Sequence, residues 1–125
     1  MIRERALKVV LVVLGLLFLG GVVPIVQRDT PIFAQMMSSL YVTLGVFLLL
    51  AVRSPSAHRS LIAYAGWANL AHGAVMALQV SRHAIPRSDL LGGALPLAIV
   101  GAVLIALTPA KRSESSEVRV SAAAA

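Results

Sequence analysis

Four long apolar stretches without a charged residue make up most of this 125-residue chain. They run over about Val9–Val26, Ile32–Val52, Leu61–Val80 and Leu90–Leu107. A run of about 18 or more uncharged, mostly apolar residues is long enough to cross the hydrocarbon core of a bilayer as a helix. The pattern therefore predicts an all-α integral membrane protein with four transmembrane helices.

Residues that favour helix ends separate the four stretches. Pro31 stands at the expected first position of the second helix, where its missing N–H costs nothing. Pro55 and Pro86 interrupt the later connections, and Pro96 should kink the fourth helix. Because the connections are short, consecutive helices should be antiparallel neighbours in an up-down-up-down four-helix bundle. We expect one domain, residues 1–109, with helices at about 7–26, 31–52, 59–82 and 89–108.

The basic residues predict the orientation in the membrane. All 11 Lys and Arg residues lie outside the apolar stretches. A cytoplasmic N-terminus places eight of them inside, namely those before the first stretch, after the second and after the fourth, and leaves three outside. Because basic residues favour the cytoplasmic side, we expect the N-in/C-in orientation. The polar residues 110–125 should then form a disordered cytoplasmic tail.

The same charge distribution indicates which partners to expect. The net charge of +6 does not point to nucleic acid, because the basic residues are divided among the helix ends. The bilayer is the expected partner, and a second copy or another membrane protein is a further one. Anionic lipid headgroups should be contacted by the basic residues of the second connection and the tail, namely Arg53, Arg59, Lys111 and Arg112.

The N-terminus also has the basic start and apolar core of a signal peptide. However, Leu19–Pro24 lacks the A-x-A cleavage pattern, and the apolar stretch is long for such a segment. We expect it to be retained as the first transmembrane helix. Cleavage is the alternative, and it would leave three spans.

Small residues indicate where helices pack closely. Gly66 and Gly73 lie on the third helix, and alanines recur every four residues on the fourth, at Ala94, Ala98, Ala102 and Ala106. Small side chains let backbones approach where no hydrophobic effect drives helices together. The third and fourth helices should therefore pack tightly. A weak similarity between residues 44–51 and 100–107 would also fit two tandem helical hairpins.

Candidate chemistry centres on His72, which is the one side chain within the apolar stretches that titrates near neutral pH. Its helical face also carries Asn69, Met76 and Gln79. The second helix carries a polar face that includes Ser38 and Tyr41. We predict a polar seam between helices two and three, with these six residues as candidate ligand-binding residues. The seam is either a set of interhelical hydrogen bonds or a small cavity for a ligand, a proton or a metal.

Several kinds of site are not expected. The chain has no cysteine, and no Asp or Glu lies within an apolar stretch, so thiolate chemistry and carboxylate relays at membrane depth are excluded. Haem held by His72 would need a dimer or five-coordinate iron, because His58 and His83 lie in connections. We therefore predict no catalytic residue, no metal and no cofactor.

Several segments resemble a family of small bacterial integral membrane proteins of unknown function. They comprise residues 36–51, 53–55 and 58–62, Trp67 and residues 72–77. The resemblance covers about residues 15–108, and the layout is distantly similar to that of DoxX-like four-helix membrane proteins. It implies four transmembrane helices and a bacterial inner membrane. It implies no activity, cofactor or catalytic residue.

These observations predict a multi-pass inner-membrane protein that is not an enzyme and has an accessory or structural role. One alternative is a small-ligand or solute-binding transport protein that acts as an oligomer, since a single four-helix subunit has little interior. A second alternative is a haem- or quinone-linked redox membrane protein.

Overall fold

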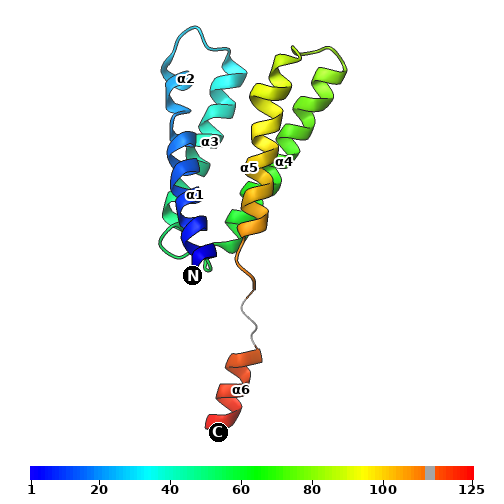
Figure 1. The fold of residues 1–125 in the computed structure, drawn as a ribbon. Coiled ribbons are helices and arrows are strands. Elements are labelled where there is room, and N and C mark those ends of the chain that lie inside the picture. The colour runs from blue at the N-terminus through cyan, green and yellow to red at the C-terminus, as the bar shows by residue number, and fades with distance from the viewer. Residues whose placement is uncertain (112–114) are drawn as a thin grey trace.

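The computed structural model describes residues 1–111 and 115–125, with only the backbone for residues 115–118. The described residues contain helices and no strand (Figure 1). The elements are α1 (Ile2–Leu19), α2 (Val22–Val26), α3 (Ile32–Ala51), α4 (Arg59–Ser81), the π-helical η1 (Leu90–Ala94), α5 (Leu95–Leu107) and α6 (Ser115–Ala124). The prediction of an all-α chain is confirmed.

Four helical segments are long and apolar enough to cross a membrane, namely Ile2–Val26, Ile32–Ala51, Arg59–Ser81 and Leu90–Leu107. Their outer faces carry large apolar side chains, such as Leu17 and Trp67, which are 65% and 63% exposed. An apolar surface this extensive is unfavourable in water and favourable in lipid. These four segments are therefore those of a multi-pass membrane protein.

The first membrane segment begins earlier than the sequence suggests and is divided in two. Helix α1 begins at Ile2, so the basic residues Arg3 and Arg5 are already helical. The division falls at Gly20–Gly21, between α1 and α2. Pro24 has no N–H to donate to the carbonyl of Gly20, which accepts instead from Val23 at 3.1 Å. The chain therefore makes one tighter turn, with a bond between residues three apart, before the helix continues to Val26.

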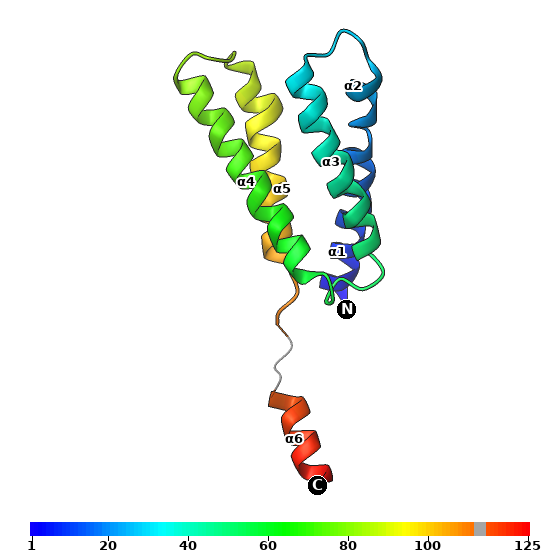
Figure 2. The ribbon, with the colours of Figure 1, turned by 180° about the vertical axis from the view of Figure 1, so that it is seen from behind.

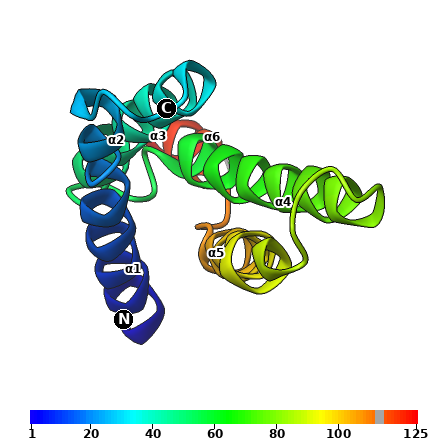
Figure 3. The same cartoon turned by 90° about the horizontal axis from the view of Figure 1, so that it is seen from above.

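The helices associate as two pairs. Helix α1 packs along α3, and α4 packs along α5, whereas α1 meets α5 and α3 meets α4 over much shorter lengths. Figures 1 and 2 show the two pairs diverging towards the loops that join α2 to α3 and α4 to η1. From above, the α4–α5 pair lies beside the α1–α3 pair (Figure 3). The molecule is thus two helical hairpins joined mainly at one end.

A glycine contact holds each hairpin together. A Cβ atom added at Gly45 on α3 would lie 2.8 Å from the carbonyl oxygen of Gly15 on α1. In the second hairpin, one added at Gly101 on α5 would lie 2.7 Å from the carbonyl oxygen of Gly66 on α4. Since no side chain larger than hydrogen fits, both contacts require glycine. The close packing expected for the third and fourth helices is present, and the first hairpin uses the same device.

The two hairpins share one apolar core near the end that carries the N-terminus. Its fully buried side chains come from both hairpins and are Leu7, Leu11, Leu48, Ala51, Ile62, Ala65 and Leu104. Hydrogen bonds reinforce this end, because Arg3 donates to the carbonyls of Ala106 at 2.8 Å and Thr108 at 3.1 Å. Farther from this core, α3 and α4 do not pack closely against each other. The candidate site lies between them there.

The fourth membrane segment begins as a π-helix, directly before the proline that was expected to kink it. Residues Leu90–Ala94 form one wide turn, in which the N–H of Leu95 donates to the carbonyl of Leu90. Pro96 follows in the first turn of α5, and it cannot donate to the carbonyl of Gly92. A π-turn next to a proline shifts the hydrogen-bond register and so accommodates the missing donor.

The C-terminal region differs from the expected disordered tail. Residues Ser115–Ala124 form helix α6, which Figure 1 draws apart from the hairpins. The segment ends in alanines, the residues with the highest helix propensity. They favour a helix although the residues before them are polar. The expectation for residues 112–114 falls outside the described residues.

Candidate functional site

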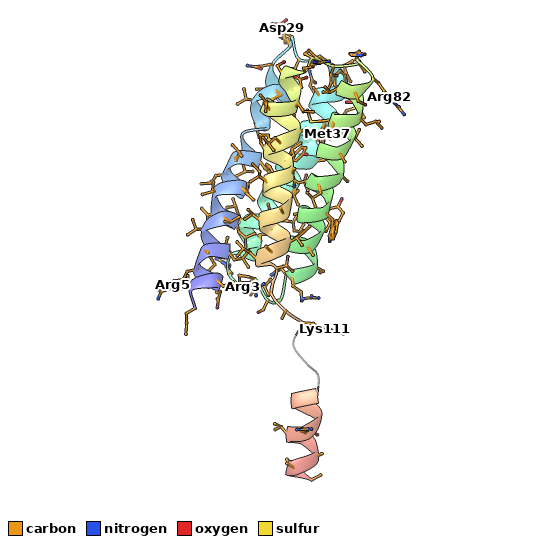
Figure 4. The ribbon with its side chains drawn as sticks, turned by 45° about the vertical axis from the view of Figure 1, so that its right-hand side comes forward. Arg3, Arg5, Asp29, Met37, Arg82 and Lys111 are labelled. Carbon is orange, nitrogen blue, oxygen red and sulfur yellow. The ribbon has the colours of Figure 1, made fainter. Side chains whose placement is uncertain are left out.

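The space between α3 and α4 is hollow. Two adjoining cavities of about 370 Å³ and 700 Å³ lie between these helices and share three lining residues, Met37, Tyr41 and His72. Met37 is labelled in Figure 4 on the part of α3 that faces α4. Small-molecule sites in proteins are typically about 300–1,000 Å³. We call this space the α3–α4 groove, and it has the size of a ligand site.

The groove is mainly apolar and is open at its side. Its smaller cavity is lined by Leu40, Leu44, Phe47, Leu61, Tyr64 and Ala68 beside the polar residues described below. Its larger cavity extends towards the diverging ends of the helices, past Phe33 and Val75. No lining residue of either cavity carries a carboxylate, an ammonium or a guanidinium group. The lining therefore suits an uncharged, apolar body.

One hydrogen bond crosses the groove. The hydroxyl of Tyr41 on α3 lies 2.7 Å from Nδ1 of His72 on α4, and the two rings are 5.8 Å apart. Tyr41 is also fixed from the other side, because its ring packs edge-to-face on Phe18 of α1 at 5.0 Å. This contact chain links three helices and holds the imidazole at the boundary of the two cavities.

Asn69 is the buried polar residue of the groove and is 1% exposed. Its Nδ2 donates to the carbonyl of Ala65, one turn earlier on the same helix, at 2.7 Å. Its Oδ1 is buried and accepts no hydrogen bond from the described part of the chain. A buried acceptor without a donor is unfavourable, so this oxygen favours a ligand or a water that can donate to it.

The six candidate residues of the predicted seam all line the groove. Tyr41 and His72 line both cavities, and Asn69 lines the smaller one. The larger cavity is lined by Ser38, Met76 and Gln79. Only Tyr41 and His72 bond each other across the groove among the described residues, whereas Asn69 bonds its own helix.

Other polar side chains of α3 donate their hydrogen bonds to nearby backbone carbonyls and not to α4. Thr43 donates to the carbonyl of Ser39, and Ser39 donates to that of Met36, so both hydroxyls are used within α3. Gln35 donates to the carbonyl of Thr30 and closes the loop before α3. Short hydroxyl side chains on a helix readily donate to a carbonyl three or four residues earlier, which is closer than any acceptor on a neighbouring helix.

The aromatic lining of the groove is a feature that the sequence reasoning missed. Phe33, Phe47 and Tyr64 line it, together with Met37 and Leu44. With Leu40 included, the members on α3 follow one another at intervals of three or four residues, which is the spacing of a single helical face. That periodicity was the available signal. In an apolar helix it is masked by equally apolar residues on the lipid-facing side.

Groups suited to a metal ion are not found in the described residues. They contain no cluster of three or more His, Cys, Asp or Glu side chains. His58 lies in the loop before α4, where its Nδ1 is 3.0 Å from the carbonyl oxygen of Ser54. His72 therefore has no second histidine beside it within this part of the chain.

Of the basic residues expected to contact lipid headgroups, one is hydrogen-bonded within the protein and two are exposed. Arg59 donates through Nε to the carbonyl of Pro109 at 3.1 Å, while Arg53 and Lys111 are exposed. Arg112 lies outside the described residues. Figure 4 shows Arg3, Arg5 and Lys111 at one end of the hairpins, and Asp29 and Arg82 at the other.

The chain was compared with known protein families, curated proteins and solved structures. A model of a family of unknown function, DUF6632, matches residues 4–123. The chain belongs to this family. No curated protein and no solved structure matches the chain. Membership of DUF6632 implies no activity.

Proposed function

We propose that this DUF6632 protein is a multi-pass membrane protein, not an enzyme, that binds a small lipid-soluble ligand in the α3–α4 groove. The observation that carries the proposal is that Tyr41 and His72 meet beside cavities of about 370 Å³ and 700 Å³ rather than in a packed interface. A purely structural seam would be closely packed, as the α4–α5 interface is where the backbones of Gly66 and Gly101 meet. The groove thus favours ligand binding over a structural role alone.

The position of the groove supports access from the bilayer. It lies between two membrane-length helices, Ile32–Ala51 and Arg59–Ser81. Its lining is uncharged, and it is open at the side rather than closed by a third helix. A ligand dissolved in the hydrocarbon could enter without crossing a polar barrier. This route favours apolar molecules over water-soluble ions, for which the groove offers no opposite charge.

For the setting, we propose an up-down-up-down arrangement in a bacterial inner membrane, with both termini in the cytoplasm. The basic residues Arg3, Arg5, Arg59 and Lys111 support this orientation, because they belong to the end that carries the N-terminus and the chain after α5. The bacterial setting rests on the resemblance described above. In this orientation the diverging ends of α3 and α4 lie towards the outer leaflet.

The proposal is tested by native mass spectrometry of the full-length protein, extracted from membranes directly into lipid nanodiscs. We expect an added mass other than bulk phospholipid on the wild-type chain. The Ala68→Phe variant fills the smaller cavity and should lose this mass. Ala74→Phe is the matched control, because Ala74 is an exposed alanine of α4 outside both linings. A wild-type chain without added mass, or equal retention by both variants, would contradict the proposal.

A further inference from the structure

We infer that the ligand of the α3–α4 groove is an uncharged lipid-soluble alcohol or phenol, held by a hydroxyl that donates to Asn69 and accepts from the Tyr41–His72 pair. The inference rests on the proposed function and names the chemistry of its ligand. It follows from counting the hydrogen-bond donors and acceptors that the groove leaves unused. The apolar lining then defines the rest of the molecule.

The unused acceptor is Oδ1 of Asn69. Its partner nitrogen is committed to the carbonyl of Ala65 at 2.7 Å, and this bond fixes the amide so that the oxygen is the free end. The residue is 1% exposed, so neither bulk solvent nor the groove as it stands reaches the oxygen. Because Asn69 lines the smaller cavity, a donor would reach this oxygen from that cavity by displacing the side chains that cover it.

The unused donor belongs to the Tyr41–His72 pair. An uncharged imidazole carries one N–H and one bare nitrogen. If the hydroxyl of Tyr41 donates to Nδ1 of His72, the proton of the imidazole lies on Nε2 and is free. If Nδ1 instead donates to Tyr41, the phenolic O–H is free. In either tautomer the pair joined at 2.7 Å offers one donor that no described residue accepts.

The residues that carry this acceptor and this donor are neighbours. Asn69 and His72 are three residues apart on α4, and both line the smaller cavity. A hydroxyl is the smallest organic group that donates one hydrogen bond and accepts another. A ketone, an ester or an ether accepts only, so it would leave Asn69 unsatisfied. A cationic amine or a carboxylate would bring a charge that no lining residue neutralises.

The apolar part of the ligand follows from the remaining lining. Beyond the polar residues, the smaller cavity is walled by Leu44, Phe47 and Tyr64, and the larger one by Phe33 and Val75. These side chains can pack on an alkyl or prenyl chain, or on an aromatic ring. The hydroxyl would sit beside His72, at the boundary of the cavities, and the chain would extend along the groove towards the bilayer.

The test compares each hydroxyl ligand with its own methyl ether, which keeps the shape and the acceptor oxygen but has no proton to donate. The probes are a C15 prenyl alcohol and a long-chain alkylphenol, each titrated against the full-length wild-type protein in nanodiscs. We expect the hydroxyl form of at least one probe to bind about tenfold or more tightly than its ether. The alcohol and phenol arms distinguish the two sources of the same hydroxyl chemistry.

The variants locate the effect. In Asn69→Leu, which is close in volume, the alcohol and its ether should bind with equal affinity. Should that variant fail to fold, the wild-type comparison of hydroxyl with ether decides alone. Equal binding of hydroxyl and ether to the wild type, lost in Ala68→Phe, would overturn the hydroxyl inference and leave a groove ligand of other chemistry. Groove occupancy by water only, with no probe bound, would overturn the inference and the proposed function together.

Discussion

Tyr41 on α3 and His72 on α4 are joined by a 2.7 Å hydrogen bond that is the one side-chain bond between these two helices in the described part of the chain. It bridges two hairpins that otherwise meet mainly at the end of the molecule that carries the N-terminus of the chain. The bond therefore has two consequences that can be measured separately, one for stability and one for ligand binding.

Removing the bond should cost little stability. In Tyr41→Phe the ring still packs on Phe18 at an edge-to-face distance of 5.0 Å, and only the hydroxyl is lost. Interhelical hydrogen bonds in membrane proteins contribute about 0.6 kcal/mol on average and at most about 1.7 kcal/mol. A double-mutant cycle of Tyr41→Phe and His72→Phe, unfolded in mixed micelles, should give a coupling in this range. A coupling above about 3 kcal/mol would mean that the bond is chiefly structural.

The glycine contacts should be far less tolerant. A Cβ at Gly101 would meet the carbonyl oxygen of Gly66 at 2.7 Å, which is backbone and cannot move aside as a flexible side chain does. Gly101→Ala should therefore destabilise the protein by about 1–3 kcal/mol, measured by thermal unfolding in detergent. Gly92→Ala is the matched control, because nothing lies within 4 Å of its added Cβ. Equal stabilities of the two variants would show that the close approach is not needed.

Arg3 should stabilise the joined end of the hairpins through the last carbonyls of α5. It donates to Ala106 at 2.8 Å and Thr108 at 3.1 Å, and a cation at a helix C-terminus is favourable by about 0.3–1 kcal/mol. Arg3→Gln should lower the free energy of unfolding by about that amount at low salt, and by less in high salt. Arg5→Gln, at an exposed position on the same helix, provides the comparison. A loss for Arg5→Gln as large as that for Arg3→Gln would point to a general charge effect instead.

The orientation is tested by reporters fused to the two ends of the chain. We expect a reporter that is active only in the cytoplasm to work at both termini, because the basic residues of both ends are then on the cytoplasmic side. A reporter that is active only in the periplasm should stay inactive at either position. Periplasmic activity at the C-terminus alone would mean that one of the four segments in residues 2–107 does not span the membrane.

Much of the fold follows from the sequence, because uncharged stretches of membrane length leave few alternatives. The spacing of Asn69 and His72 predicted one shared face of the third membrane helix, and both residues line the smaller cavity, as Tyr41 does. However, helical periodicity does not give the distance between the facing sides of α3 and α4. The groove depends on the angle between the hairpins, which meet mainly at the shared core near the end that carries the N-terminus.

Local hydrogen bonding accounts for the other differences. Asn69 bonds its own helix rather than α3, because the carbonyl of Ala65 lies one turn away and accepts from its Nδ2 at 2.7 Å. The π-helical turn at Leu90–Ala94 and the break at Gly20–Gly21 both lie next to a proline, where a neighbouring N–H donates in a different register because the proline has none. Such choices between neighbouring donors and acceptors leave no mark in the pattern of apolar residues.

The central claim, that the α3–α4 groove binds a lipid-soluble ligand, is tested most directly by photolabelling in native membranes. A diazirine-bearing prenyl alcohol is photolysed with the full-length protein, and the labelled residues are mapped by peptide mass spectrometry. We predict labels on residues of the smaller cavity such as Met37 and Tyr41 that disappear in Ala68→Phe and persist in Ala74→Phe. Labels spread over outward-facing residues such as Leu17 and Trp67, and unchanged by Ala68→Phe, would contradict the account.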